Sequence, residues 1–284
     1  MRKVCVHNDG MLSVILVLIL SASLCQAQTS RSAQAYLSRA NERYAKGELN
    51  AAIADYDIAI TFDPGSAEAN CNRGNARQDK GDLDGAITDY TKVIQLLPRS
   101  AVAYYNRGNA RKAKGDIDGA IDDYSSAIAL NHRFAEAYSN RAHARLGSDL
   151  NGVIADCDRA IEINPRLAKA YVNRGAARKE KGNLNEAIAD FSKAIALDPG
   201  LAIGYNNRGA TLSERGELDK AITDYNRSIQ INPRLAVAYL NRGLVLLIQG
   251  KTVEAGRDFD QCIELDSDLR TVIAKRINEI NRRP

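Results

Sequence analysis

Residues 103–130 read AYYNRGNARKAKGDIDGAIDDYSSAIAL, and close copies of this stretch recur along most of the chain. The motif NRGNAR within it returns, with variations, at almost constant intervals. The six motifs begin at Asn72, Asn106, Asn140, Asn173, Asn207 and Asn241. Their separations are 34, 34, 33, 34 and 34 residues. A constant period of this length is typical of a protein built from stacked repeats, so the repeat decides the fold.

Residues 33–269 divide into seven repeats of 34 residues, except that the fourth is one residue shorter. We count places from the first residue of each repeat, so that the recurring Asn occupies place 6. The missing residue of the fourth repeat predicts a shortened junction near 145–152. The repeats span 33–66, 67–100, 101–134, 135–167, 168–201, 202–235 and 236–269.

Each repeat contains two helical stripes. In the third repeat the first stripe includes Tyr104 and Gly108, and the second consists of Ala120, Tyr124 and Ala127. Residues three or four places apart share one face of a helix. The intervening KGDID supplies a glycine that suits a helix end and an aspartate that suits a helix start. The sequence therefore predicts two helices joined by a tight turn, which can bury both faces only by stacking.

This pattern resembles the tetratricopeptide repeat family, with an aromatic residue at places 4 and 24, Gly or Ala at place 8, Ala at places 20 and 27, and Pro at place 32. Local departures include Asn70 at place 4 and Cys157 at place 24. The resemblance implies an all-α fold, a right-handed α-solenoid with a concave groove. Residues 270–284 repeat the first-helix stripe, which predicts a C-terminal capping helix. Members of the family are usually non-enzymatic scaffolds that bind proteins or peptides.

The resemblance places the Asn column on the concave groove, which places 2, 6, 9 and 13 line. A carboxamide offers donors and an acceptor, so a row of them can hold the main chain of an extended peptide. Such a row is similar to the asparagine ladder of a tetratricopeptide superhelix. The alternative is that each carboxamide bonds within its own repeat or to water. The predicted ladder consists of Asn72, Asn106, Asn140, Asn173, Asn207 and Asn241.

The same face becomes apolar toward its C-terminal end. Val237, Leu244 and Ile248 line it in repeat seven, which predicts a site for an apolar anchor of the partner. The alternative is that the capping helix covers them. Lys169 is the only basic residue at place 2, so the basic clamp that other members use for terminal carboxylates is not expected.

Two charged columns flank the packing stripes, with Arg at place 7 and Asp at place 23 of all seven repeats. We expect each Asp to pair with the Arg of the following repeat, because Asp258 then pairs with Arg276 of the capping helix. These columns predict structural ion pairs that keep the repeats in register rather than a catalytic site.

Composition and motifs exclude several classes of function. The formal net charge is +4 with both signs interspersed, which is not the footprint of a nucleic-acid-binding protein. Cys71, Cys157 and Cys262 are scattered, which argues against a zinc site or a disulfide framework. No phosphate loop or hydrolase motif is present. We therefore expect no enzyme activity, no metal, no cofactor and no small-molecule substrate.

Residues 1–27 stand apart from the repeats. Arg2 and Lys3 precede the apolar run MLSVILVLIL and a stretch of small residues that ends at Ala27. This order predicts a secretory signal peptide, and hence export, to a bacterial periplasm. The alternative is that residues 11–24 remain as a membrane anchor. The second function to weigh is then a tethered envelope assembly factor that docks a partner complex on its convex surface.

Overall fold

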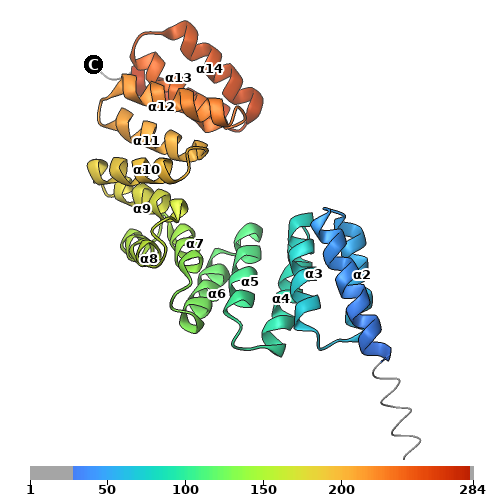
Figure 1. Ribbon diagram of the computed structural model, residues 1–284. Coiled ribbons are helices and arrows are strands. Elements are labelled where there is room, and N and C mark those ends of the chain that lie inside the picture. The colour runs from blue at the N-terminus through green and yellow to red at the C-terminus, as the bar shows by residue number, and fades with distance from the viewer. Residues whose placement is uncertain (1–27, 282–284) are drawn as a thin grey trace, which may run out of the picture. The chain divides into compact units, whose positions relative to one another are not determined.

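The computed structural model describes residues 28–281, and every regular element in this part of the chain is an α-helix (Figure 1). The helices form two compact halves, divided between Asn131 and His132. The predicted signal peptide lies outside the described residues. Between residues 28 and 281, no helix combines the length and the hydropathy that a membrane span requires.

The N-terminal half consists of helices that pack in chain order, so that the odd-numbered and even-numbered helices are the first and second helices of successive repeats. Its first helix covers the described residues 28–45. The others are α2 (Leu49–Phe62), α3 (Ala67–Lys80), α4 (Leu83–Leu96), α5 (Ala101–Lys114) and α6 (Ile117–Leu130).

The C-terminal half continues the same order, and the helices from α9 to α14 stack one after another (Figure 1). The first helices of neighbouring repeats also contact one another directly, α9 with α11, α11 with α13, and α13 with α15. This packing is that of an all-α repeat solenoid. The helices are α7 (Ala135–Arg145), α8 (Leu150–Ile163), α9 (Ala168–Glu180), α10 (Leu184–Leu197), α11 (Ala202–Glu214), α12 (Leu218–Ile231), α13 (Ala236–Ile248), α14 (Thr252–Leu265) and α15 (Leu269–Asn281).

The tight turn within a repeat has the local chemistry that its sequence predicts. Gly115 follows α5 with φ of 91°, a left-handed conformation in which its N–H bonds the last carbonyls of the helix. Asp116 then caps α6, because its side chain accepts a hydrogen bond from the N–H of Gly119. The two residues reverse the chain and satisfy the helix ends on both sides.

The fourth repeat corrects one expectation. Its junction is not shortened: residues 146–149 separate α7 from α8, whereas only residues 115 and 116 separate α5 from α6. The first helix is shorter instead, with 11 residues in α7 against 14 in α5. Gly147 has φ of 87°, so the left-handed turn follows a helix that has already ended.

Small residues let the paired helices approach closely. A Cβ atom added to Gly108 on α5 would lie 2.8 Å from the ring of Tyr124 on α6. Ala120, Tyr124 and Ala127 are completely buried. The aromatic ring at place 24 therefore fills the space that the absent side chain at place 8 leaves open.

The Arg and Asp columns pair within a repeat, which corrects the expected pairing with the following repeat. In repeat two, Arg73 donates from Nε and Nη2 to the two carboxylate oxygens of Asp89, at 3.0 and 2.5 Å. The two columns pair within a repeat because places 7 and 23 face each other across its two helices. Arg276 of α15 pairs with Glu279 instead of Asp258. Asp258 is paired with Arg242 of its own repeat.

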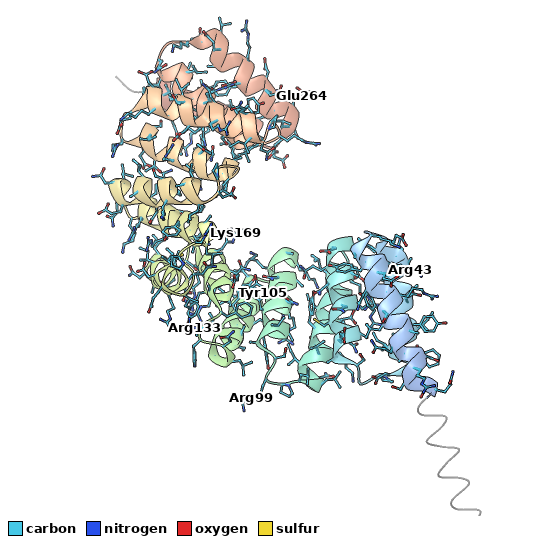
Figure 2. All side chains as sticks on the ribbon, viewed as in Figure 1. Arg43, Arg99, Tyr105, Arg133, Lys169 and Glu264 are labelled. Atoms are coloured by element: carbon cyan, nitrogen blue, oxygen red, sulfur yellow. The ribbon has the colours of Figure 1, made fainter. Side chains whose placement is uncertain are left out.

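The same arginines also reach the preceding repeat. Arg73 donates from Nη1 to Asp57, and Arg174 donates in the same way to Asp158. A second arginine at place 11 approaches the buried Asp, as Arg43 does on the helix at residues 28–45 (Figure 2). The ion pair thus joins the two helices of one repeat, and the remaining N–H group of Arg73 or Arg174 joins that repeat to the preceding one.

Candidate peptide-binding groove

A cavity opens on the first-helix side of the last repeats, within the C-terminal half. Its volume is about 470 Å³, and α9, α11, α12, α13 and α15 all contribute to its lining. The apolar part includes Leu244, Ile248 and Val272. Ile248 is 47% exposed and Val272 is 40% exposed, so the capping helix adds to this apolar surface without covering it.

A second cavity of about 360 Å³ continues the first along α9 and α11. Ala176, Phe191 and Asn207 line it, and it shares Lys179 and Glu214 with the first cavity. Nζ of Lys179 lies 3.5 Å from a carboxylate oxygen of Glu214, so this ion pair borders both cavities. We call the two cavities together the C-terminal groove.

Two members of the predicted ladder lie in the C-terminal groove. Asn207 lines the smaller cavity and Asn241 lines the larger one. Their carboxamides are linked through Asn206 at place 5, because Asn241 Nδ2 donates to Asn206 Oδ1 at 3.0 Å. Asn206 Nδ2 in turn donates to Asn207 Oδ1 at 3.1 Å. This relay orients both carboxamides across neighbouring repeats.

In the N-terminal half the ladder residues bond to the repeat before them. Asn72 Nδ2 donates to Asn41 Oδ1 at 3.0 Å, and Asn106 Nδ2 donates to Asn75 Oδ1 at 3.4 Å. Both side chains are half-buried. Asn140 lies on α7, in the C-terminal half, and is also half-buried. The carboxamides of Asn72 and Asn106 therefore help to stack the repeats, which the sequence does not predict.

Asn173 requires a correction, because its side chain does not lie open on the groove. It is 6% exposed, and Nδ2 donates to the main-chain oxygen of Ser139 at 2.9 Å. Place 5 of the preceding repeat is a small serine at this point, which lets the carboxamide turn between the two helices. Asn173 therefore joins α9 to α7 inside the stack.

The remaining predicted residues divide between the groove and its surroundings. Leu244 lines the larger cavity, as expected. Lys169 is exposed near the start of α9 (Figure 2), and Val237 is half-buried near the start of α13. Neither lines the two cavities. Place 2 lies one turn from place 6 and reaches the rim of this face rather than its floor.

A second set of asparagines, at place 9, accepts hydrogen bonds from the buried tyrosines at place 24. The hydroxyl of Tyr56 donates to Asn41 Oδ1 at 2.7 Å, and that of Tyr90 donates to Asn75 Oδ1 at 2.7 Å. Tyr124 donates to Asn109 in the same way at 2.8 Å. The sequence contains a signal for these pairs, since place 24 is Phe in repeats five and seven, where place 9 is Ala or Leu.

The burial of Tyr56 predicts a loss of stability at alkaline pH. Burial raises the pKa of Tyr56 to about 12 from its usual value near 10. The unfolded chain therefore loses this proton first. The stability that the protonated hydroxyl of Tyr56 contributes is fully present below pH 10, and it is lost as the pH rises through about 12. Urea unfolding at increasing pH measures this, and Tyr56→Phe should flatten that part of the profile. An equal decline in Tyr56→Phe would contradict the assignment.

The thiol on the packing stripe of repeat four is not a reactive group. Cys157 is completely buried, and burial raises its pKa to about 12, so the thiol stays protonated at neutral pH. Among the described residues, no three His, Cys, Asp or Glu side chains are grouped as a metal site requires. The lining of the groove offers carboxamides, apolar side chains and the Lys179–Glu214 ion pair.

Models of the tetratricopeptide repeat family match most of the chain. A model described as TPR repeat matches residues 40–81, 74–115, 108–147 and 211–250. Three models described as tetratricopeptide repeat match residues 168–201, 191–223 and 236–269. No curated relative matches the sequence.

Solved structures of similar fold include three that cover most of their own length. A tetratricopeptide repeat protein from Parabacteroides merdae is 21% identical with a TM-score of 0.72, over 89% of this chain and 100% of its own. MamA protein is 29% identical with a TM-score of 0.54, over 59% of this chain and 92% of its own. YrrB, described as a TPR protein with an unusual peptide-binding site, is 24% identical with a TM-score of 0.51, over 64% and 95%.

Proposed function

Because the chain belongs to the tetratricopeptide repeat family, we propose that it is a non-enzymatic scaffold that binds an extended segment of a partner protein in the C-terminal groove. The observation that supports this most directly is the composition of the groove. Apolar side chains of α13 and α15 border the larger cavity, and carboxamides lie at its side and in the smaller one. An extended polypeptide presents the same alternation of side chains and polar main-chain groups.

The proposal assigns the main-chain contacts to Asn207 and Asn241. Each carboxamide carries two N–H donors and an oxygen with two lone pairs. The relay through Asn206 uses one N–H of Asn241 and one lone pair of Asn207. The other donor and acceptor groups remain available to a peptide. The ladder is thus proposed for these two repeats, and the asparagines of the N-terminal half contribute mainly to stacking.

The fold relatives support the class of function and not a particular partner. YrrB is described as having a peptide-binding site. At 24% identity the likeness concerns the fold. The partner of this chain is therefore proposed only by its chemistry, as a neutral segment with an apolar residue.

We also propose that the protein is exported and cleaved after Ala27, which would place the partner in a bacterial periplasm. The support is the order of charged, apolar and small residues within residues 1–27. N-terminal sequencing of the protein recovered from a periplasmic fraction tests this. A membrane-bound chain that retains residues 11–24 would favour the tethered assembly factor instead.

Site-specific photo-crosslinking separates binding in the groove from docking on the face of the second helices. A photoreactive residue at Ser213 lies in the larger cavity, whereas one at Ala196 on α10 lies exposed among the second helices. We expect a partner of defined mass to be captured at Ser213 and not at Ala196. Unlabelled protein in excess should compete with the capture.

The reverse pattern would reject the groove and support the alternative of docking on the second helices. Both variants should have the melting curve and the export level of the wild type, so that a difference in folding or export does not explain a selective result. Capture of the same partner at both positions would also contradict the proposal, because a segment held in the groove cannot touch both faces.

A further inference from the structure

Repeat six retains the buried tyrosine at place 24 but has alanine where the hydrogen-bond acceptor should be. Tyr225 is 1% exposed, and place 9 of its repeat is Ala210. In the part of the chain that the structure describes, no residue hydrogen-bonds the Tyr225 hydroxyl, and no solvent-inaccessible side-chain N or O atom lacks a partner. The oxygen atom of the Tyr225 hydroxyl must therefore be accessible to solvent. Tyr225 and Ala210 both line the larger cavity of the groove.

The ring of Tyr225 occupies the same position as its counterparts. A Cβ atom added to Gly209 would lie 2.9 Å from Cε1 of Tyr225, and one added to Gly74 would lie 2.8 Å from Cε1 of Tyr90. The hydroxyl of Tyr90 donates to Asn75 at place 9. By this equivalence the hydroxyl of Tyr225 points at the space beside the methyl group of Ala210.

A second donor borders the same space. In repeat one, Asn41 Oδ1 accepts from the hydroxyl of Tyr56 at 2.7 Å and from Nδ2 of Asn72, in the next repeat, at 3.0 Å. Tyr225 and Asn241 occupy the equivalent places around repeat six. Asn241 lines the cavity and uses one N–H for Asn206, so its second N–H remains. Two donors thus surround a place that, in repeat one, holds a carboxamide oxygen.

The surroundings favour a neutral acceptor with an apolar neighbour. Leu244, Ile248 and Val272 are part of the apolar lining. The charged groups of the rim are paired with one another, Lys179 with Glu214 at 3.5 Å and Arg276 with Glu279 at 3.2 Å. Among the described residues that line the larger cavity, both cations are thus paired, whereas an amide oxygen would satisfy both donors without a charge to desolvate.

We propose that this cavity binds an apolar residue of the partner polypeptide, with its main-chain carbonyl oxygen in the place that the Asn41 side-chain oxygen occupies in repeat one. The carbonyl accepts from Tyr225 and Asn241, and the side chain packs on Leu244, Ile248 and Val272. The inference rests on the proposed function, because it specifies how the C-terminal groove holds its peptide.

The test uses the full chain with labelled methyl groups and the capped peptide acetyl-Ala-Leu-Ala-amide, followed by NMR. Addition of the peptide should shift the methyl signals of Leu244, Ile248 and Val272. Acetyl-Ala-Ala-Ala-amide should shift them far less. Tyr225→Phe should weaken the leucine peptide roughly five- to tenfold through the loss of one hydrogen bond. Ala210→Asn should abolish binding, because the new carboxamide supplies the missing oxygen from within the chain.

Stability gives an independent readout. Tyr225→Phe removes no hydrogen bond within the protein and should leave the urea midpoint unchanged. Tyr90→Phe, the matched control, removes the 2.7 Å hydrogen bond to Asn75 and leaves that oxygen only the longer bond from Asn106 at 3.4 Å. It should lower the midpoint without affecting peptide binding. A lowered midpoint in Tyr225→Phe would mean that the hydroxyl serves the fold and would overturn the proposal.

The outcomes also separate this inference from the proposed function. If the leucine peptide shifts signals along the groove but Tyr225→Phe and Ala210→Asn bind it as tightly as the wild type, the inference fails and groove binding stands. If the peptide moves no signal of α9, α11, α13 or α15, both fail.

Discussion

Replacing Asp89 by alanine is expected to lower the free energy of unfolding by about 3–5 kcal/mol, the cost of breaking a buried ion pair from one side. Asp89 is 1% exposed and accepts two hydrogen bonds from Arg73 and one from Arg77. Its removal leaves two largely buried guanidinium groups without their main partner. Urea unfolding followed by circular dichroism measures the change.

The matched control is Asp84→Ala, on the same helix. Asp84 pairs with Lys114 at 2.5 Å, but the two side chains are 78% and 49% exposed. A surface pair of this kind contributes about 0–1 kcal/mol, because water screens it. Equal effects of the two substitutions would show that burial of the carboxylate is not what matters, which would contradict the structural role of the Asp column.

The length and the two-helix content of the repeats could be predicted because both follow from local spacing. The first helices of repeats two to seven begin at the first residue of each predicted repeat, as α5 does at Ala101 and α9 at Ala168. Glycine takes the left-handed conformation in the turn of every repeat, and Asp82, Asp116 and Asp149 cap the second helices of repeats two to four. These residues can be predicted from the sequence of a single repeat.

The partners of charged and polar side chains were less predictable, because they depend on which of two nearby helices a long side chain reaches. The sequence identifies the Arg and Asp columns but not their pairing within one repeat. The Asn column predicts Asn173 on the groove, although its side chain is buried against Ser139. A periodic column specifies the face of a helix within about one residue, and adjacent places differ by roughly 100°. A rotation of this size decides whether a carboxamide lies open on the groove or is buried in the stack.

The candidate site follows the same division. Leu244 and Ile248 could be assigned to the groove from their places, and the capping helix could be predicted from its stripe. The contribution of that helix to the groove, through Val272 and Arg276, could not, because its rotation about its own axis is set by packing on α13 and α14.

The capping helix gives the second large effect. Ile273→Ala is expected to lower the free energy of unfolding by about 2–5 kcal/mol, the range for deleting a buried aliphatic side chain. Ile273 is 5% exposed and packs in one cluster with Leu240, Phe259 and Cys262 of repeat seven. Without the Ile273 side chain, the capping helix packs less tightly on the last repeat. Hydrogen exchange should therefore speed up first in α13 and α14, and the repeats of α9–α12 should be affected less.

Val272→Ala is the matched control, because the adjacent residue faces the groove instead of the stack. Val272 is 40% exposed, and its truncation should change stability by no more than about 0.5 kcal/mol. It should nevertheless weaken binding of an apolar peptide, since it removes part of the cavity lining. If Val272→Ala were as destabilising as Ile273→Ala and left binding unchanged, α15 would be a cap alone. If Ile273→Ala lowers stability and Val272→Ala weakens binding, one short helix both closes the repeat stack and completes its binding site.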